Sequence, residues 1–283
     1  MKRVLTAAIG IPLALWAVFR LPATWFLLLI LVIAELAVVE YVRLAQTWTS
    51  KRVLAFLYVA VPLVTASLMP WWVLDHSSLW LSADFVAVAR LIGFSGLICI
   101  AIVAASWILL ARIPVKDAMG ALGSLCFGVP YLVLPAVSLC YLQATDPWLL
   151  LLLLAVVWAG DSAAFVVGSK LGKHKLAPTI SPNKSWEGAV ASLVGALAAA
   201  LVWREFYSAK TGLALLILVA VTGVVAQLGD LVESMLKRGA GVKDSGTLLP
   251  GHGGILDRFD ALFFAAPVFG VGVYVIALLE DVS

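Results

Sequence analysis

Long apolar runs recur along the chain and constrain its fold more than any other feature. Of the 283 residues, 63% are hydrophobic and 12% are charged, whereas a soluble domain carries about 25% charged residues. Runs of about 20 apolar residues are typical of membrane-spanning helices, because a helix satisfies its own backbone hydrogen bonds inside lipid. The sequence therefore predicts an all-α polytopic membrane protein.

Nine spans are predicted from these runs, with boundary errors of a few residues. They cover residues 4–20, 24–44, 53–70, 90–111, 119–142, 147–168, 187–204, 211–236 and 259–280. The first run is similar to the apolar core of a signal peptide, but no convincing small-residue cleavage site follows it. We therefore expect a first membrane helix there.

Lys and Arg are distributed unevenly between the two sides that these spans define. Thirteen lie in the loops after even-numbered spans, and six lie on the other side. Because Lys and Arg accumulate in cytoplasmic loops, the even loops are predicted to face the cytoplasm, with both termini outside. If the first segment does not span, the N-terminus moves inside and the even loops keep their side.

One polar segment, residues 234–260, separates the last two predicted spans. It reads SMLKRGAGVKDSGTLLPGHGGILDRFD and interleaves acids and bases with glycine. Lys and Arg attract phosphate, and glycine lets backbone N–H groups approach it closely. A cluster of cations alone is also typical of contact with anionic lipid, but lipid attraction needs no glycine turn such as residues 251–254. The segment therefore predicts a phosphate site at the membrane surface.

Carboxylates of three spans are predicted to lie at one depth. Asp161 lies 14 residues after Pro147, about 21 Å along a helix, which is still inside the membrane near its cytoplasmic boundary. Asp230 lies near the same boundary at the end of its span, and Asp260 lies there at the start of the last span. The alternative is three unrelated carboxylates at helix ends, which Asp161 disfavours because its helix continues beyond it.

Helical spacing places further acids beside these. Asp230 and Glu233 share one helical face, and Asp257 and Asp260 share another. Carboxylate oxygens suit hard cations such as Mg²⁺. The predicted metal ligands are Asp230, Asp257 and Asp260, with Asp161 and Glu233 as outer or additional ligands. The structural alternative pairs Glu233 with Lys237 within the helix.

Two more acids, Glu35 and Glu40, lie within the second span. A carboxylate at membrane depth is a candidate functional group. Glu40 has Arg43 three residues further on, which favours an intrahelical pair. A structural role is also favoured for Glu35.

A second polar loop, residues 168–188, lies on the same side as the segment 234–260. Pro182 is predicted to set a polar turn there, and Ser185 is suited to cap the next helix. The candidate phosphate-binding residues of this turn are Ser181, Asn183, Lys184 and Ser185. The neighbouring Lys170, Lys173, His174 and Lys175 are interpreted as mostly surface residues. A site built from two loops is therefore feasible.

The segment 234–260 resembles the signature of the phosphatidate cytidylyltransferase family, also called CDP-diacylglycerol synthases. The matching positions are Ser234, Lys237, Arg238, Lys243, Asp244, His252, Gly253, Gly254, Asp257, Arg258 and Asp260. Residues 181–182, 184–188 and 228–230 are also similar to family elements, and Glu40 with Tyr41 is similar to its Glu–aromatic pair. One departure follows Asp161, where Ser-Ala-Ala-Phe stands in place of the Ser/Thr-Gly-Ala-Tyr that the family often has, so any role of a tyrosine hydroxyl is lost.

The resemblance implies an integral-membrane nucleotidyltransferase of phospholipid biosynthesis, which makes CDP-diacylglycerol and pyrophosphate from CTP and phosphatidic acid. It implies N-terminal transmembrane helices in residues 1–118 and a C-terminal transmembrane catalytic region in residues 119–283. The residues expected to act in catalysis are Lys237, Lys243, Asp244, His252 and Arg258. Those expected to bind substrate are Ser181, Asn183, Lys184, Ser185, Arg238, Gly253 and Gly254.

The expected cofactor is Mg²⁺, with room for a second cation, and nucleic acid is not an expected partner. The expected location is a bacterial inner membrane, with a polar cavity facing the cytoplasm. A homodimer is one option, and the sequence leaves the oligomeric state open.

Two other classes of protein remain. One is a different transferase or phosphatase that acts on a lipid phosphate such as a polyprenol phosphate, which nucleotide dependence would separate. The other is a cation-coupled transporter, with Glu35 and Asp161 lining a pathway. Transport predicts acids spread across the membrane, whereas the acids here are predicted to cluster on one side.

Overall fold

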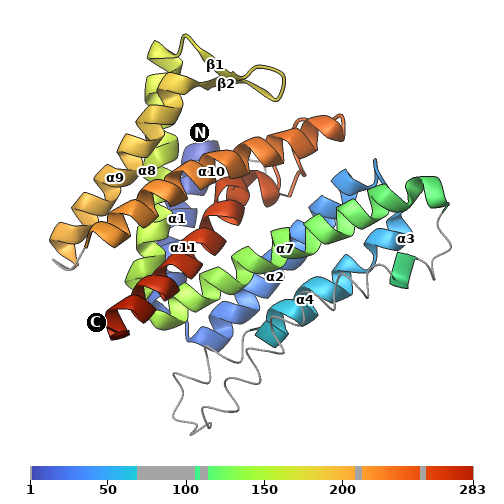
Figure 1. Ribbon diagram of the computed structural model, residues 1–283, viewed down its shortest axis with the longest axis horizontal. Helices are drawn as coiled ribbons and strands as arrows, with labels where there is room; N and C mark the ends of the chain where they lie inside the picture. The colour runs from blue at the N-terminus through green and yellow to red at the C-terminus, as the bar shows by residue number, and fades with distance from the viewer. Residues whose placement is uncertain (1, 69–105, 109–113, 208–211, 249–252, 283) are drawn as a thin grey trace, which may run out of the picture. The chain divides into compact units, whose positions relative to one another are not determined.

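The computed structural model describes residues 2–68, 106–108, 114–207, 212–248 and 253–282, and most of them are helical (Figure 1). The helices are α1 (Lys2–Arg20), α2 (Ala23–Ala45), α3 (Lys51–Leu54), α4 (Leu57–Leu68), α7 (Val115–Thr145), α8 (Pro147–Leu171), α9 (Trp186–Phe206), α10 (Leu213–Gly239) and α11 (Leu256–Val282). Two short strands, β1 (Lys175–Ala177) and β2 (Ser181–Ser185), form the hairpin.

Six of the described helices are long and apolar enough to cross a membrane, namely α2, α7, α8, α9, α10 and α11. They confirm six of the predicted spans and the all-α membrane class, so the chain is an integral membrane protein. Of the other predicted spans, 4–20 coincides with α1, which is not among the six, and 53–70 contains α3 and α4. The span 90–111 lies outside the described residues, except for 106–108.

The chain divides into two compact units. Unit 1 comprises Met1–Thr145 and Gly239–Arg258, and unit 2 comprises Asp146–Arg238 and Phe259–Ser283. The middle of the segment 234–260 therefore belongs to unit 1, and its two ends belong to unit 2. The predicted division near residue 118 stays a prediction.

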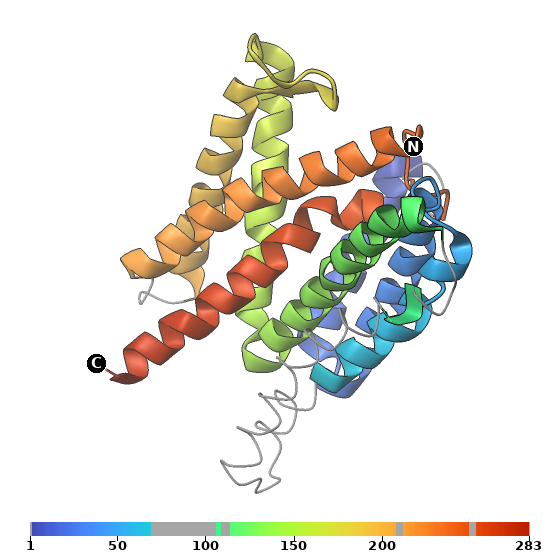
Figure 2. The ribbon, with the colours of Figure 1, turned by 45° about the vertical axis from the view of Figure 1, so that its right-hand side comes forward.

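Unit 1 is built on α2, α4 and α7, which run side by side (Figures 1 and 2). Tyr41 of α2 is buried against α7, where its hydroxyl donates to the Ser124 carbonyl over 2.8 Å. A Cβ at Gly128 would lie 2.6 Å from the Tyr41 ring. The glycine therefore makes room for the tyrosine, and the contact fixes the end of α2 that carries Glu40.

Unit 2 contains the pair α8 and α9, which lie side by side in both views (Figures 1 and 2). Small residues line their contact: a Cβ at Gly160 would come 2.9 Å from the Ser192 hydroxyl oxygen. Helices α10 and α11 also approach closely, since a Cβ at Gly229 would come 2.8 Å from the Asp260 carbonyl oxygen. This glycine therefore allows Asp230 of α10 and Asp260 of α11 to lie near one another.

The loop between α8 and α9 is a β-hairpin, which corrects the predicted polar turn at Pro182. The antiparallel strands pair Lys175 with Ser185, and the turn lies between Ala177 and Ile180, whose N–H donates to the Ala177 carbonyl over 3.2 Å. Pro178 stands at the second turn position, where its fixed φ suits a β-turn. Pro182 lies in β2 instead.

The predicted cap of α9 is confirmed. The Ser185 side chain accepts a hydrogen bond from the Gly188 N–H over 3.2 Å. Glu187 of the same turn holds the hairpin base, because its Oε1 lies 2.7 Å from His174 Nδ1. The Trp186 N–H donates to the His174 carbonyl over 2.9 Å. Hydrogen bonds therefore join the base of the hairpin to the first turn of α9.

Candidate functional site

A cavity of about 620 Å³ lies in unit 2, lined by residues of α8, the hairpin, α9 and α10. It brings together all four predicted residues of the hairpin region and two of the predicted metal ligands. These are Ser181, Asn183, Lys184, Ser185, Asp161 and Asp230.

An ion pair lies in this cavity. Lys184 Nζ of β2 lies 2.6 Å from Asp230 Oδ2 of α10, and the two side chains are 23% and 31% exposed. Asp161 of α8 interacts electrostatically with both partners, repelling Asp230 and attracting Lys184. One ammonium group therefore interacts with two carboxylates, and the three groups come from three different elements.

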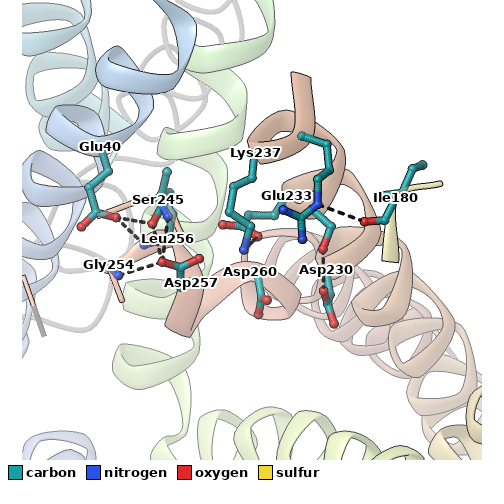
Figure 3. A network of polar contacts seen from close by, with 12 residues as sticks. Glu40, Ile180, Asp230, Glu233, Lys237, Ser245, Gly254, Leu256, Asp257 and Asp260 are labelled. Carbon is teal, nitrogen blue, oxygen red and sulfur yellow. Dashed lines mark hydrogen bonds and ion pairs between the residues drawn. The ribbon is translucent and has the colours of Figure 1, made fainter. Parts of the chain in front are cut away.

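A second cation–carboxylate pair lies further along α10 (Figure 3). Glu233 is fully buried, and its Oε2 lies 2.5 Å from Lys237 Nζ. This is the intrahelical pair that the sequence left open as an alternative to a metal ligand.

Asp260 of α11 accepts a hydrogen bond from the Ala261 N–H over 2.7 Å. It interacts electrostatically with Asp230, Asp161 and Lys237. Asp161, Asp230 and Asp260 are therefore close enough within unit 2 to interact electrostatically. Their joint role as metal ligands stays a prediction.

A different polar cluster lies in unit 1, centred on Glu40 (Figure 3). Glu40 is 3% exposed and accepts hydrogen bonds from the Ser245 hydroxyl over 2.8 Å and from the Ile255 and Leu256 N–H groups over 2.9 Å. The predicted pair with Arg43 is wrong. Within the described residues no ion pair joins the two, because the Glu40 carboxylate points to donors from a distant segment and Arg43 is exposed.

Asp257 belongs to the same cluster. Its Oδ2 accepts from the Ser245 N–H over 2.9 Å, from the Ser245 hydroxyl over 2.9 Å and from the Gly254 N–H over 2.8 Å. Gly253 has a φ of +77°, which favours glycine, and a Cβ there would come 2.5 Å from the same oxygen. Gly253 and Gly254 of the predicted phosphate turn thus lie against Asp257.

None of the remaining predicted residues that the structure describes lines the cavity. Lys243, Asp244 and Arg258 of unit 1 are exposed. Arg238 of unit 2 is also exposed, and its Nε donates to the Ile180 carbonyl over 3.4 Å. His252 lies outside the described residues.

Lys175 and Gln227 are two polar cavity residues that the sequence interpretation did not place in the site. Lys175 is exposed, as interpreted, and it also lines the cavity from β1. Gln227 lines it from α10, and its Nε2 donates to the carbonyls of Ala189 over 3.2 Å and Gly223 over 3.4 Å. The signal for Gln227 was available: it is an amide in an apolar run, three residues before Asp230 and on the same helical face.

The cavity offers oxygen donors that fit Mg²⁺, which proteins often hold through one or two carboxylates together with substrate phosphates and water. Asp161 and Asp230 are the two carboxylates that line it. In the part of the chain that the structure describes, no group of three or more His, Cys, Asp or Glu side chains is placed to hold a metal ion.

Comparison with known proteins gives consistent results. Phosphatidate cytidylyltransferase of Brucella suis is 44% identical over 142 residues, which are 49% of this chain and 53% of that protein. The proteins of the same name from Staphylococcus saprophyticus and Haemophilus influenzae are 50% identical over 117 residues and 47% identical over 135 residues. These alignments cover 41% and 44% of this chain, and 45% and 46% of the two relatives.

The chain thus spans about half the length of the curated relatives that it matches. The model of the cytidylyltransferase family, by contrast, matches residues 1–276. Because that match covers nearly the whole chain, the protein belongs to the cytidylyltransferase family.

Proposed function

We propose that this protein is a nucleotidyltransferase that makes CDP-diacylglycerol and pyrophosphate from CTP and phosphatidic acid in phospholipid biosynthesis. The observation that carries the proposal is the Lys184–Asp230 pair in a cavity that a second lysine, Lys175, also lines. Family membership and the names of the relatives support the same activity.

In this reaction a phosphate oxygen of phosphatidic acid attacks the α-phosphorus of CTP. The bond from that phosphorus to the oxygen that bridges it to the β-phosphate breaks, and pyrophosphate leaves with the electron pair. The attacking group is already an anion, so no base is needed to activate it. The protein must offset negative charge and align the two phosphates.

Residues of the cavity are suited to these tasks. Lys175 and Lys184 carry the positive charge, and Ser181 and Asn183 supply hydrogen-bonding groups close to them. Lys184 also offsets the charge of Asp230. Roles for Lys237, Lys243, Asp244, Arg258 and His252 rest on the family resemblance and stay predictions.

Mg²⁺ is part of the proposal, with Asp161 and Asp230 as the residues that would hold it and Asp260 as a neighbouring carboxylate. When bound, it would offset charge on the triphosphate. Lys184 and its hydroxyl and amide neighbours would bind phosphate oxygens beside it. A role for Asp257 as a ligand, and a second cation, rest on the family resemblance. Glu233 already has Lys237 as a partner.

The proposed arrangement has nine spans in a bacterial inner membrane and a cavity that faces the cytoplasm. The hairpin lies in one of the Lys- and Arg-rich loops that the charge distribution assigns to that side. Phe165 lines the cavity and is 75% exposed, so apolar surface extends to the polar groups. This suits entry of the lipid phosphate from the inner leaflet. A homodimer stays a prediction.

Pyrophosphate release tests the proposed activity. The full chain, purified in detergent, would be given phosphatidic acid, Mg²⁺ and each of CTP, ATP, GTP and UTP, beside the Asp257→Asn variant. We expect release with CTP, or its deoxy form, and loss in the variant. Release with another nucleotide would change the substrate, and equal release from the variant would remove Asp257 from the metal ligands. Folded protein without release under any condition would favour transport.

A further inference from the structure

The carboxylate of Glu40 joins two parts of unit 1 that are far apart in the sequence. Glu40 lies on α2, and its three donors lie on Ser245, Ile255 and Leu256, more than 200 residues later. All three bonds measure 2.8–2.9 Å, and the side chain is 3% exposed. Short hydrogen bonds from several fixed donors to one buried carboxylate indicate a specific contact of the fold.

Two of these donors are the backbone N–H groups at the start of α11. The first N–H groups of a helix have no partner within it, and a negative charge at this end is favourable. Glu40 therefore supplies, from another helix, the cap that the α11 sequence lacks at this end. Leu256 is the first residue of the helix and Asp257 the second, so the cap acts directly beside Asp257.

The Ser245 hydroxyl couples Glu40 to Asp257. Its oxygen lies 2.8 Å from Glu40 Oε2 and 2.9 Å from Asp257 Oδ2. Asp257 Oδ2 also accepts from the N–H groups of Ser245 and Gly254. Two backbone N–H groups and the shared Ser245 hydroxyl hold the Asp257 carboxylate in one orientation. Because the hydroxyl has a single proton, it donates to one of the two acids at a time.

Glycine makes this packing sterically feasible. A Cβ at Gly246 would come 2.6 Å from Glu40 Oε1, and a Cβ at Gly254 would overlap the Glu40 carboxylate. Two glycines of the signature segment therefore have a role in the folded chain that is independent of substrate.

We propose that Glu40 is a positioning residue: through Ser245 and the start of α11 it fixes the orientation of Asp257 for the reaction. This inference rests on the proposed function for the role of Asp257. It extends the candidate machinery to α2, which the phosphate and metal motifs do not include.

Glu40→Gln tests the inference, with Glu35→Gln as the matched control on the same helix. The amide of glutamine keeps one acceptor oxygen but turns an NH₂ group toward the backbone donors, so at least one of them loses its partner. Glu35 is half-buried, and one of its oxygens is buried with no hydrogen-bond partner among the described residues. Ser245→Ala removes only the coupling hydroxyl and leaves the cap of α11 in place.

Two readouts apply to the full chain in detergent. The first is amide hydrogen exchange in peptides that cover residues 245–258. The second is the half-saturating Mg²⁺ concentration, taken both from the rate of pyrophosphate release and from the Mg²⁺-dependent rise of the unfolding midpoint without substrate.

We expect Glu40→Gln to speed exchange at residues 253–258 at least about tenfold and to raise half-saturating Mg²⁺ about tenfold. Peptides of α9 should be unchanged. Ser245→Ala should raise half-saturating Mg²⁺ with a smaller effect on exchange, and Glu35→Gln should match wild type in both readouts.

Unchanged exchange in Glu40→Gln would overturn the inference. Faster exchange with an unchanged half-saturating Mg²⁺ concentration would also overturn it. That result would indicate a purely structural role, because a loss of folded protein lowers only the maximal rate. If wild type released no pyrophosphate with CTP, the proposed function would fail, while exchange and the Mg²⁺-dependent midpoint would still decide whether Glu40 controls Asp257.

Discussion

The two units hold their buried acids in different ways. In unit 1 the carboxylates of Glu40 and Asp257 accept hydrogen bonds from backbone N–H groups and a serine hydroxyl. In unit 2 the carboxylates of Asp230 and Glu233 pair with lysine ammonium groups. A backbone N–H group cannot move away from its acceptor unless the local turn unfolds. A lysine ammonium group on its flexible side chain can move to another anion.

This difference separates acids that stabilise the fold from acids that are expected to act on substrate. Glu40 is almost completely buried and is not among the residues that line the 620 Å³ cavity, so breaking its contacts should lower the free energy of unfolding and disturb the start of α11. Asp230 and Lys184 are partly exposed in a cavity, so changing them should affect binding and rate more than folding. Substitutions in the two units should therefore have opposite profiles.

The largest effect is expected for Asp230→Asn. The change leaves the part-buried Lys184 ammonium without its carboxylate partner and removes an oxygen ligand from the cavity, so pyrophosphate release should fall roughly 100-fold or more. Glu205→Gln, an exposed acid on α9, should keep the wild-type rate. The unfolding midpoint of both should stay close to that of wild type. A large fall in the midpoint of Asp230→Asn would mean that the Asp230 pair is structural.

A glycine in unit 1 should show the reverse profile. Gly254→Ala puts a methyl group into the Glu40 carboxylate, and such overpacking costs about 1–3 kcal/mol of the free energy of unfolding. Gly123→Ala on the exposed face of α7 meets no atom within 4 Å and should stabilise by about 0.5–1 kcal/mol through helix propensity. Denaturant titration of both variants checks the sign, and equal stabilities would contradict the contact.

Two serine-to-alanine changes compare the units directly. Ser245→Ala removes the hydroxyl that two carboxylates share and should lower the free energy of unfolding by about 1–2 kcal/mol. Ser181→Ala in the cavity should leave stability within about 0.5 kcal/mol and raise the KM for CTP. Thermal unfolding and steady-state kinetics on the same preparations separate the two. Identical profiles for both variants would remove the distinction between the units.

The smallest effect is expected within one basic loop. Both lysines are exposed, but Lys175 lines the cavity, whereas Lys170, five residues earlier, does not. Lys175→Ala should raise the KM for CTP about threefold to tenfold, the range of one partly solvated charge contact to phosphate. Lys170→Ala should have no effect. A larger effect from Lys170→Ala would contradict the position of the cavity.

Much of the fold follows from local pattern. Apolar runs predicted the six helices that are confirmed, and a serine before Trp186 predicted the cap of α9. The convergence of Asp161, Asp230 and Asp260 followed from their depth along helices of known rise. Each of these depends on spacing within one element, which a sequence displays directly.

The contacts that were missed depend on tertiary packing. Arg43 was the nearest partner for Glu40 along the helix, but the observed donors lie more than 200 residues away, where no spacing rule applies. The hairpin turned at Pro178 rather than Pro182 because strand pairing, which requires two segments, decides the register. Lys175 is exposed like its neighbours Lys170 and Lys173, and only the hairpin shows that it lines the cavity.

The most direct test of the account follows the α-phosphorus of CTP. CTP labelled at the α-phosphorus, or separately at the γ-phosphorus, would be incubated with phosphatidic acid, Mg²⁺ and the full chain, and the lipid and aqueous phases would be counted. We expect α-label to enter the lipid phase, γ-label to appear as pyrophosphate, and Asp230→Asn to lower both roughly 100-fold or more. Label from the γ-position in lipid, or no α-label in lipid from folded protein, would contradict it.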